Sequence, residues 1–428
     1  MNTNNQTVQL KQITPMELYS LGLSSDSFET IPTIDELKKS PPNIVVAECV
    51  FSIRFVQNKF DKHQQLDKKE KYVMSAGVYQ QLHYDVRASG MSGNGRGLEI
   101  LKPATIQFKK IYRPYTGQDL TNKTLLVTRQ GGIGDLLFIQ PNLTYLKEKY
   151  PSCTINFACG PQYQSMVKEW DCIDNVLDLP FLVQEMFHAD YHLVFEGVIE
   201  RCKEAEEICS YNLFSRWMGL NLPDELLVPK QKPNEETTIV VKEDYLKELE
   251  LQEKDFIIIQ MRASSPIRTP SPDIWRKLIN MLTDKGHNIL LTDISDRKHD
   301  IENFISTLQN KDKVKNFAKY SKQIADTISA VSLSKLVIAT DSALPHIAES
   351  LGIKSFAVMG PFPGRVRYST YKNNDWIDVI REECSPCFTH GLNPCKHSFN
   401  SHSDCYKNID YDLCIEKIER LLNVQNIS

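Results

Sequence analysis

Thr124-Leu125-Leu126-Val127-Thr128, followed by Arg129-Gln130-Gly131-Gly132-Ile133-Gly134-Asp135, is the stretch that decides the fold of this chain. The apolar and β-branched run predicts a buried strand, and the glycines predict a tight turn that can adopt positive φ. The apolar residues 136–140 then predict the start of a helix, whose first N–H groups attract anions. Because Asp135 at this turn would repel a phosphate, we expect it to face a hydroxyl whose proton must be removed.

Two other interpretations of the glycine turn remain open. A dinucleotide site requires the pattern Gly-x-Gly-x-x-Gly, but Leu137 stands where the third glycine belongs. The second predicted strand, residues 155–159, ends in Cys159 rather than in the acidic residue that would bind a ribose. These departures disfavour a nicotinamide or flavin site, and a turn needed only for packing is the other alternative.

Strands and helices alternate from residue 122 onward. Predicted strands 124–128 and 155–159 begin a first unit, and strands 256–260 and 336–339 belong to a second. This alternation predicts α/β domains with parallel sheets covered by helices on both faces. We therefore expect two tandem Rossmann-like domains. The expected segments are a polar N-terminal segment (1–40), a small β-rich domain (41–120), the first Rossmann-like domain (121–228), the second (240–382), and a cysteine-rich knuckle with a C-terminal helix (383–428).

A second motif, Thr340-Asp341-Ser342-Ala343-Leu344-Pro345-His346, directly follows the predicted strand 336–339. Its first three residues are good helix N-caps, and Pro345 suits the first helical turn. The small residues leave room for a ligand at the helix N-terminus, and His346 could hydrogen-bond a sugar hydroxyl or a phosphate. A capped helix with a core histidine is the plain alternative. The loop after the next strand holds Gly360, with Arg365 and Arg367 available to anions.

Composition bounds the protein class. The 428 residues are 41% hydrophobic and 24% charged, as in ordinary globular proteins, and the net charge of −4 favours neither nucleic acid nor acidic membranes. We find neither an apolar run long enough to span a membrane nor a secretory signal, so a cytoplasmic location is expected. Homo-oligomerisation stays open, with residues 41–120 as a docking module.

Five of the eleven cysteines crowd into the last part of the chain. Cys384, Cys387, Cys395 and Cys405 follow a spacing that begins with C-x2-C, which suits tetrahedral thiolate coordination of a metal. In a reducing cytosol such a cluster favours metal over disulfides. We therefore predict a structural zinc or iron, with His390, His397 or His402 as substitute ligands.

Three features, in this order and spacing, resemble glycosyltransferase family 9, the heptosyltransferases and their relatives. They are the glycine turn that ends in Asp135, the motif 340–346, and the loop that begins with Gly360-Pro361. The resemblance covers roughly residues 122–420. It implies the GT-B architecture and inverting transfer from an ADP-linked heptose or similar nucleotide-sugar to a glycan or protein hydroxyl, with no catalytic metal. The cysteine-rich tail further resembles the autotransporter heptosyltransferases, in which four cysteines hold an iron; the N-terminal sequence does not visibly match theirs.

The resemblance also implies roles for individual residues. Asp135 corresponds to the proposed general base and His346 to the family's helix histidine, and we take both as catalytic. For the donor, a cation before the helix tryptophan Trp275 pairs with the phosphates, and Arg268 is the nearest, with Arg262 as its competitor. The remaining donor-binding positions are Gly132, Gly134, Ser264, Ser265, Asp341, Ser342, Ala343, Gly360 and Arg365.

Two alternative functions remain beside the glycosyltransferase. A nicotinamide-dependent oxidoreductase would use the glycine turn, although the turn lacks the third glycine. A catalytically inactive binding protein would use the metal knuckle and the β-rich region instead. Intact Asp135 and His346 argue against such decay.

Overall fold

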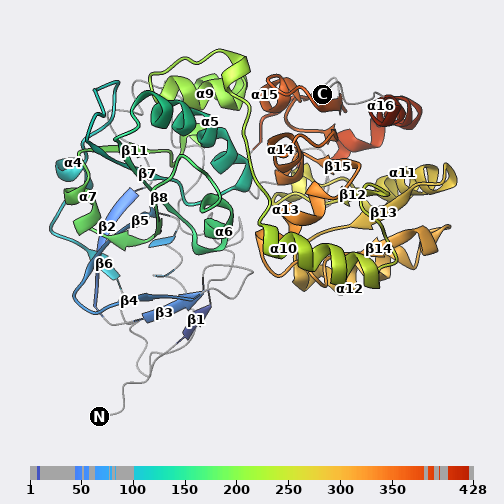
Figure 1. Ribbon diagram of the computed structural model, residues 1–428, viewed down its shortest axis with the longest axis horizontal. Coiled ribbons are helices and arrows are strands. Elements are labelled where there is room, and N and C mark those ends of the chain that lie inside the picture. Colours follow the sequence, from blue (N-terminus) through green and yellow to red (C-terminus); the bar gives the residue numbers. More distant parts are fainter. Residues whose placement is uncertain are drawn as a thin grey trace, which may run out of the picture. The chain divides into compact units, whose positions relative to one another are not determined.

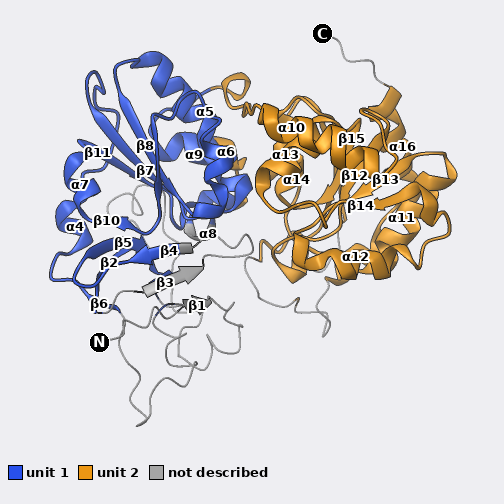
Figure 2. Cartoon of the chain, turned by 60° about the horizontal axis from the view of Figure 1, so that its bottom comes forward, with its two compact units in different colours: residues 1–205, 212–222 blue, residues 206–211, 223–428 orange. Residues whose placement is uncertain are grey.

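The computed structural model describes residues 7–9, 44–50, 53–56, 63–76, 78–79, 82, 101–379, 384–389, 395 and 403–423. The chain divides into two compact units, coloured separately in Figure 2. Unit 1 comprises residues 1–205 and 212–222, and unit 2 comprises residues 206–211 and 223–428. Each unit contains one parallel sheet (Figure 1).

The parallel sheet of unit 1 has the strand order β11-β7-β8-β9. Its strands are β7 (Thr124–Thr128), β8 (Thr154–Cys159), β9 (Asn175–Asp178) and β11 (Tyr191–Val194). The helices of this unit are α4 (Phe108–Ile111), α5 (Ile133–Lys149), α6 (Gln164–Val167), α7 (Gln184–His188) and α8 (Val198–Arg201), and α9 (Ser210–Trp217) has residues in both units. The strand–turn–helix predicted at residues 124–140 is present as β7, the glycine turn and α5.

Two further sheets lie in unit 1. One is three-stranded, in the order β1 (Thr7–Gln9), β3 (Ile53–Val56) and β4 (His63–Leu66). The other is antiparallel, in the order β10 (Phe181–Leu182), β5 (Lys71–Ser75), β2 (Ile44–Cys49) and β6 (Leu101–Pro103). One buried cluster joins Val46 and Val73 of this antiparallel sheet to Leu126 and Ala158 of the parallel sheet. The β-rich region therefore shares a core with the Rossmann-like part of unit 1.

Unit 2 is built on a six-stranded parallel sheet with the order β14-β13-β12-β15-β16-β17. The strands are β12 (Phe256–Gln260), β13 (Asn288–Leu291), β14 (Val314–Asn316), β15 (Leu336–Thr340), β16 (Ser355–Met359) and β17 (Asn374–Asp378). The helices are α10 (Glu235–Val240), a π-helical turn (Val241–Leu246), α11 (Pro272–Asp284), α12 (Lys298–Ile305), α13 (Ile324–Ser332), α14 (Ala343–Ser350), α15 (Arg365–Tyr368) and α16 (Tyr411–Asn423).

The central strands of unit 2 are apolar along their whole length because both faces of the sheet are covered. A cluster containing Ile257, Leu291 and Ile338 packs with α11, α12 and α16. Ala357 and Met359 belong to a separate cluster with Phe362 and the residues of α15. The predicted α/β class with two Rossmann-like domains is thus confirmed.

Local boundaries differ from the sequence prediction in two places. The sequence predicts a helical segment from Pro141 to Tyr150, but α5 begins at Ile133 and Pro141 lies inside it. The alternating run 104–108 predicts a strand, but residues 104–107 link β6 to α4 and Phe108 begins α4. The helix expected at residues 15–23 lies outside the described residues. Among the described helices, none combines the length and the apolar character that a membrane crossing requires.

Candidate active site

The glycine turn after β7 brings the backbone close to two side chains. Gly132 has φ +87°, a conformation that favours glycine, and it forms the N-cap of α5. A Cβ added to Gly132 would collide with the Asp135 carboxylate, and one added to Gly131 would collide with the Tyr163 ring. The turn therefore needs glycine at both positions. Gly134, also predicted for the site, lies in the first turn of α5.

Asp135 forms an ion pair with Arg129 at this turn. The Arg129 side chain is only 4% exposed, whereas that of Asp135 is 22% exposed. The guanidinium also donates to the carbonyls of Phe195 (2.9 Å) and Gly131 (3.1 Å). Arg129 is thus fixed between the ends of two neighbouring strands, and it holds the more accessible carboxylate of Asp135 in place.

In unit 2, Asp341 lies directly after β15 and is 2% exposed. Its carboxylate faces two arginines: Arg268 Nη1 is 3.3 Å from Oδ2, and Arg367 Nε is 3.7 Å from Oδ1. Burial by itself would raise the pKa of this carboxyl, but the charges of Arg268 and Arg367 outweigh it and lower the pKa below its usual value. The cluster carries a net positive charge at the carboxyl edge of the sheet.

Arg268 is the more accessible of these two cations, with 23% of its side chain exposed. It donates to the carbonyl oxygen of Asp341 (3.1 Å) and to the hydroxyl of Ser264 (2.9 Å). The carbonyl oxygen of Arg268 accepts from the hydroxyl of Tyr406 (3.1 Å). Arg268 therefore links Ser264 of its own loop to Asp341, which follows β15.

Arg262, the competitor of Arg268, lies apart from Asp341. Its side chain is 45% exposed, and its guanidinium is 3.8 Å from Asp300 at the surface. Ser265 is buried, and its carbonyl accepts from the hydroxyl of Thr269 (3.1 Å), so it shapes the loop rather than facing a ligand. Of the two arginines, Arg268 therefore belongs to the cluster around Asp341, and Arg262 does not.

The helix that follows Asp341 starts at Ala343, and Ser342 is its N-cap. The Ser342 hydroxyl donates to Gln260 at the end of β12 (2.7 Å) instead of capping the helix. The carboxyl ends of β12 and β15, which are adjacent in the sheet, are thereby joined by a side-chain hydrogen bond. Because no side chain caps α14, its first N–H groups are available to an anion.

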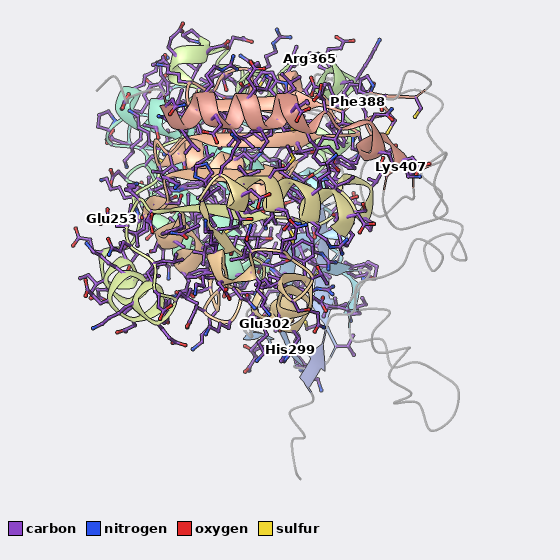
Figure 3. The ribbon with its side chains drawn as sticks, turned by 90° about the vertical axis from the view of Figure 1, so that its right-hand side faces the viewer. Glu253, His299, Glu302, Arg365, Phe388 and Lys407 are labelled. Carbon is purple, nitrogen blue, oxygen red and sulfur yellow. The ribbon has the colours of Figure 1, made fainter. Side chains whose placement is uncertain are left out.

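Arg365, predicted as a donor ligand, points away from this cluster. It is exposed, is labelled in Figure 3, and donates to the backbone carbonyls of Glu206 and Glu207. Arg367 faces the cluster instead: it is buried, lies against Asp341, donates to the Ser210 hydroxyl (2.8 Å) and stacks over Phe362 (4.5 Å). The sequence did not predict which of Arg365 and Arg367, two residues apart in the short helix α15, would face inward.

Gly360 is required for a different reason from the glycines of unit 1. A Cβ at this position would meet the Tyr406 hydroxyl at 2.7 Å, so Gly360 makes room for that ring. The Tyr406 hydroxyl also lies 3.2 Å from Thr340, which precedes Asp341. Tyr406 therefore supports this loop from the C-terminal segment, and no local sequence pattern predicts such a contact.

His346 lies on the inner face of α14 and is 3% exposed. Its Nδ1 hydrogen-bonds the hydroxyl of Tyr371, which in turn lies 2.8 Å from the hydroxyl of Tyr211. Burial, with a smaller contribution from the neighbouring arginines, lowers the pKa of His346 to about 3. The imidazole is therefore neutral at physiological pH and fixed in orientation by Tyr371.

The four predicted cysteine ligands fall in described positions, and the three alternative histidines do not. Cys405 is buried, and burial raises the pKa of its thiol, with further contributions from the nearby Cys387 and Cys395. The backbone N–H of Cys387 donates to the Pro361 carbonyl (3.1 Å), and the ring of the next residue, Phe388, packs on Phe362. Phe388 is labelled in Figure 3. Within the described ranges, however, no group of three or more Cys, His, Asp or Glu side chains is close enough to hold a metal ion.

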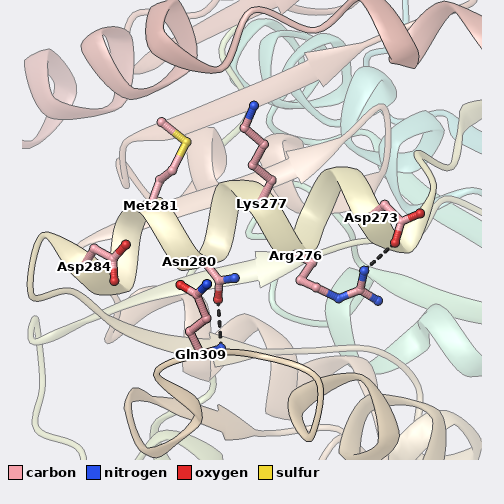
Figure 4. A pocket seen from close by; sticks show the side chains of 7 residues that line it. All are labelled: Asp273, Arg276, Lys277, Asn280, Met281, Asp284 and Gln309. Carbon is pink, nitrogen blue, oxygen red and sulfur yellow. Dashed lines mark hydrogen bonds and ion pairs between the residues drawn. The ribbon is translucent and has the colours of Figure 1, made fainter.

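One shallow hollow of unit 2 lies elsewhere, along the flank of α11 (Figure 4). In it, Arg276 pairs with Asp273, and Asn280 accepts from the backbone N–H of Gln309 (3.2 Å). Its lining residues are Asp273, Arg276, Lys277, Asn280, Met281, Asp284 and Gln309. None of the predicted site residues lines it.

Comparisons with known proteins agree with this geometry. Residues 207–396 match the family model "Glycosyltransferase family 9 (heptosyltransferase)". A comparison with curated proteins gives no match. The match of the family model covers β12, β15, α14 and the cluster around Asp341, so the part of the chain with the arginine–aspartate cluster is the part that carries the family's signature.

Solved structures resemble the chain in fold. An E. coli ADP-heptose lipopolysaccharide heptosyltransferase II is 15% identical, with a TM-score of 0.53 over 70% of this chain and 98% of that one. A family 9 glycosyltransferase from Veillonella parvula DSM 2008 is 14% identical, with a TM-score of 0.56 over 71% and 98%. The iron-containing dodecameric glycosyltransferase TibC from enterotoxigenic E. coli H10407 is 10% identical, with a TM-score of 0.49 over 89% and 92%.

The resemblance to the autotransporter subgroup stays a prediction, because the last of these likenesses is too low to carry an argument. The family match is confined to residues 207–396, and the first two structures resemble the chain in fold. Residues 207–396 thus match glycosyltransferase family 9, and this match supports a glycosyltransferase enzyme.

Proposed function

We propose that this glycosyltransferase moves a heptose or a similar sugar from an ADP-linked donor to a hydroxyl of a glycan or protein, with inversion at the anomeric carbon. The observation that carries the proposal is the buried Asp341 between Arg268 and Arg367 at the carboxyl edge of the unit 2 sheet. The family match and the ADP-heptose enzyme of similar fold support this choice of donor.

On the donor side, the leaving group is a nucleoside diphosphate whose negative charge grows as the bond to the sugar breaks. Arg268 is the partly exposed cation of the cluster, and α14 presents its uncapped N-terminus beside it. Fixed positive groups of this kind stabilise charge that develops in the transition state. Asp341 is not itself a phosphate ligand in this account; it orients the two guanidinium groups.

On the acceptor side, Asp135 is the proposed general base. The acceptor oxygen attacks the anomeric carbon, the bond from that carbon to the diphosphate oxygen breaks, and the acceptor's proton passes to the Asp135 carboxylate. The 22% exposure of Asp135 leaves it accessible, and Arg129 keeps it at the glycine turn. A metal is not needed for any of these steps.

His346 is proposed as a positioning group rather than a proton carrier. Its low pKa keeps the ring neutral throughout the physiological range, so it offers no second titration near neutrality. Its hydrogen bond to Tyr371 orients the imidazole inside α14, next to the Asp341 cluster. We infer that it holds the start of α14 in the geometry that receives the donor.

We also propose a structural zinc or iron held by Cys384, Cys387, Cys395 and Cys405. The burial of Cys405 and the closeness of Cys387 and Cys395 to it support the proposal. Such a metal would fix the segment before Tyr406, whose hydroxyl contacts the Arg268 carbonyl. Its role would be structural only.

The donor proposal is tested by thermal shift with ADP, UDP, GDP, CDP and NAD, each nucleoside diphosphate with and without its sugar. A ligand at a hundred times its Kd stabilises the folded state by about 2.7 kcal/mol, which is readily measured. We expect a shift with ADP that ADP-heptose enlarges. A shift with NAD alone would contradict the proposal, as would a stronger shift with another nucleotide-sugar.

A further inference from the structure

Glu196 lies two residues after β11, the strand that is adjacent to β7 in the unit 1 sheet. In parallel strands the carboxyl ends meet at one edge, so the chain after β11 runs beside the glycine turn after β7. A backbone hydrogen bond from Phe195 N–H to the Thr128 carbonyl (3.0 Å) fixes this alignment. Glu196 is therefore brought next to the segment that carries Arg129 and Asp135, although it lies more than sixty residues away in sequence.

The Glu196 side chain makes two contacts with that segment. Its carboxylate accepts the backbone N–H of Gln130, and its Oε2 lies 3.9 Å from Arg129 Nη1. The side chain is 9% exposed, which makes it a buried carboxylate beside a buried guanidinium. A buried charge is tolerated when it is paired and hydrogen-bonded, and both conditions are met here.

Arg129 consequently lies between two carboxylates. Its Nη2 pairs with Asp135, and its Nη1 faces Glu196 and donates to the Phe195 carbonyl. One end of the planar guanidinium fork is thus held by Asp135 of α5 and the other by the segment after β11, so the fork has one orientation. Tyr163 and Cys159 are further titratable groups near the turn; burial raises the pKa of Tyr163, and its side chain hydrogen-bonds the Gly132 backbone.

We propose that Glu196 is a positioning residue for the general base: it fixes Arg129 and shares its positive charge, and Arg129 in turn places the Asp135 carboxylate. Without Glu196, the full positive charge of Arg129 would act on the Asp135 carboxylate and make it a weaker proton acceptor. This inference rests on the proposed function, in which Asp135 is the general base. Glu196 itself touches neither donor nor acceptor in this account.

The Glu196→Gln variant tests this role with little structural change. Glutamine keeps an oxygen that can accept the Gln130 N–H and removes only the negative charge. Glu148→Gln is the matched control, because it removes an exposed carboxylate from the same helix as Asp135, about 20 Å further along at 1.5 Å per residue. At physiological ionic strength that separation exceeds the screening length of roughly 8 Å.

The first readout does not depend on activity. In protein labelled with ¹³C at the aspartate carboxyl, the Asp135 resonance is identified by its loss in Asp135→Asn. We expect this resonance to move in Glu196→Gln and to stay in place in Glu148→Gln. An unmoved resonance in Glu196→Gln would overturn the proposal.

The second readout is the rate of ADP release from ADP-heptose. We expect Glu196→Gln to lower kcat by roughly tenfold, with the Kd for ADP unchanged, and to have no further effect in the Asp135→Asn background. Equal losses in both backgrounds would show that Glu196 acts independently of Asp135, against the proposal. Full activity of Asp135→Asn would instead contradict the base assignment, while a moved resonance would still support the contact.

Discussion

Replacing Arg268 by alanine should weaken both the fold of unit 2 and its binding of ADP. The change removes one of the two cations that face the buried Asp341 carboxylate, together with donors to the Asp341 carbonyl and the Ser264 hydroxyl. Breaking a buried ion pair by removing one partner costs about 3–5 kcal/mol. Because Arg367 remains 3.7 Å from Asp341 and Arg268 is partly exposed, we expect a loss of about 2–3 kcal/mol in the free energy of unfolding.

The loss should depend on pH with a definite sign. The pKa of Asp341 is lowered in the folded protein, so its contribution to stability is present above its unfolded pKa and disappears as the pH falls through the folded value. Without Arg268, less positive charge offsets the effect of burial, so the pKa of Asp341 in the folded variant is higher than in the wild type. The destabilisation by Arg268→Ala should therefore be largest near neutral pH and shrink in acid, as followed by denaturant unfolding at a series of pH values.

ADP binding by the same variant tests the site itself. Loss of a charged hydrogen bond to phosphate costs about 1.5–3 kcal/mol, which corresponds to a roughly 10- to 150-fold higher Kd by titration calorimetry. Arg262→Ala is the control: it removes the same side chain from the same loop, where a surface pair with Asp300 contributes about 0–1 kcal/mol. Equal effects of the two variants on stability and on the Kd would refute the reasoning.

Three further predictions concern other parts of the chain. Gly132→Ala should destabilise the protein by more than about 1 kcal/mol and reduce activity, because a Cβ there meets the Asp135 carboxylate. Gly117→Ala is the control, because Gly117 also has a positive φ but a Cβ there meets no atom within 4 Å; similar activity losses in the two variants would contradict the account. Between pH 7 and 5 the wild type should lose about 2 kcal/mol more of its free energy of unfolding than His346→Gln does. The reason is that His346 stays neutral in the folded protein, whereas the histidine of the unfolded chain takes up a proton below about pH 6.5. Parallel curves of stability against pH for the two proteins, from denaturant titrations, would argue against this. Elemental analysis should find about one equivalent of zinc or iron, reduced in Cys387→Ser and retained in the control Cys172→Ser; less than about a tenth of an equivalent in wild type would exclude the metal.

The sequence predicted the elements whose burial is complete. Strands β7 and β12 are continuous apolar runs, and such runs are identifiable because both faces of a parallel sheet are covered. Strand β17, Asn374–Asp378, escaped prediction because it is a half-buried edge strand with acidic residues. Pro141 suggested a helix start, but a helix can accommodate proline when packing on one face outweighs the lost hydrogen bond, as in the buried middle of α5.

The site residues also divide into those that a local sequence pattern predicts and those that only contacts between distant segments bring together. Local signals located Asp135 at the glycine turn between β7 and α5, Asp341 directly after β15, and Arg268 in the loop between β12 and α11. Contacts between distant segments gave no such signal: Glu196 reaches Arg129 only because β11 pairs with β7, and Tyr406 reaches the Arg268 carbonyl from the C-terminal segment. The choice between Arg365 and Arg367 depended on which face of α15 turns inward, and four residues of helix carry too little pattern to decide it.

The central claim is that this chain is a glycosyltransferase that uses ADP-heptose and a carboxylate base at the glycine turn. The most direct measurement is the release of ADP from ADP-heptose by wild type and by Asp135→Asn, with a mixed glycan and protein fraction as acceptor. The account predicts acceptor-stimulated release by wild type and a rate at least about a hundredfold lower in the variant, with an unchanged Kd for ADP. Release by Asp135→Asn within a few-fold of wild type would contradict the base, and no release by folded wild type that binds ADP would contradict the donor.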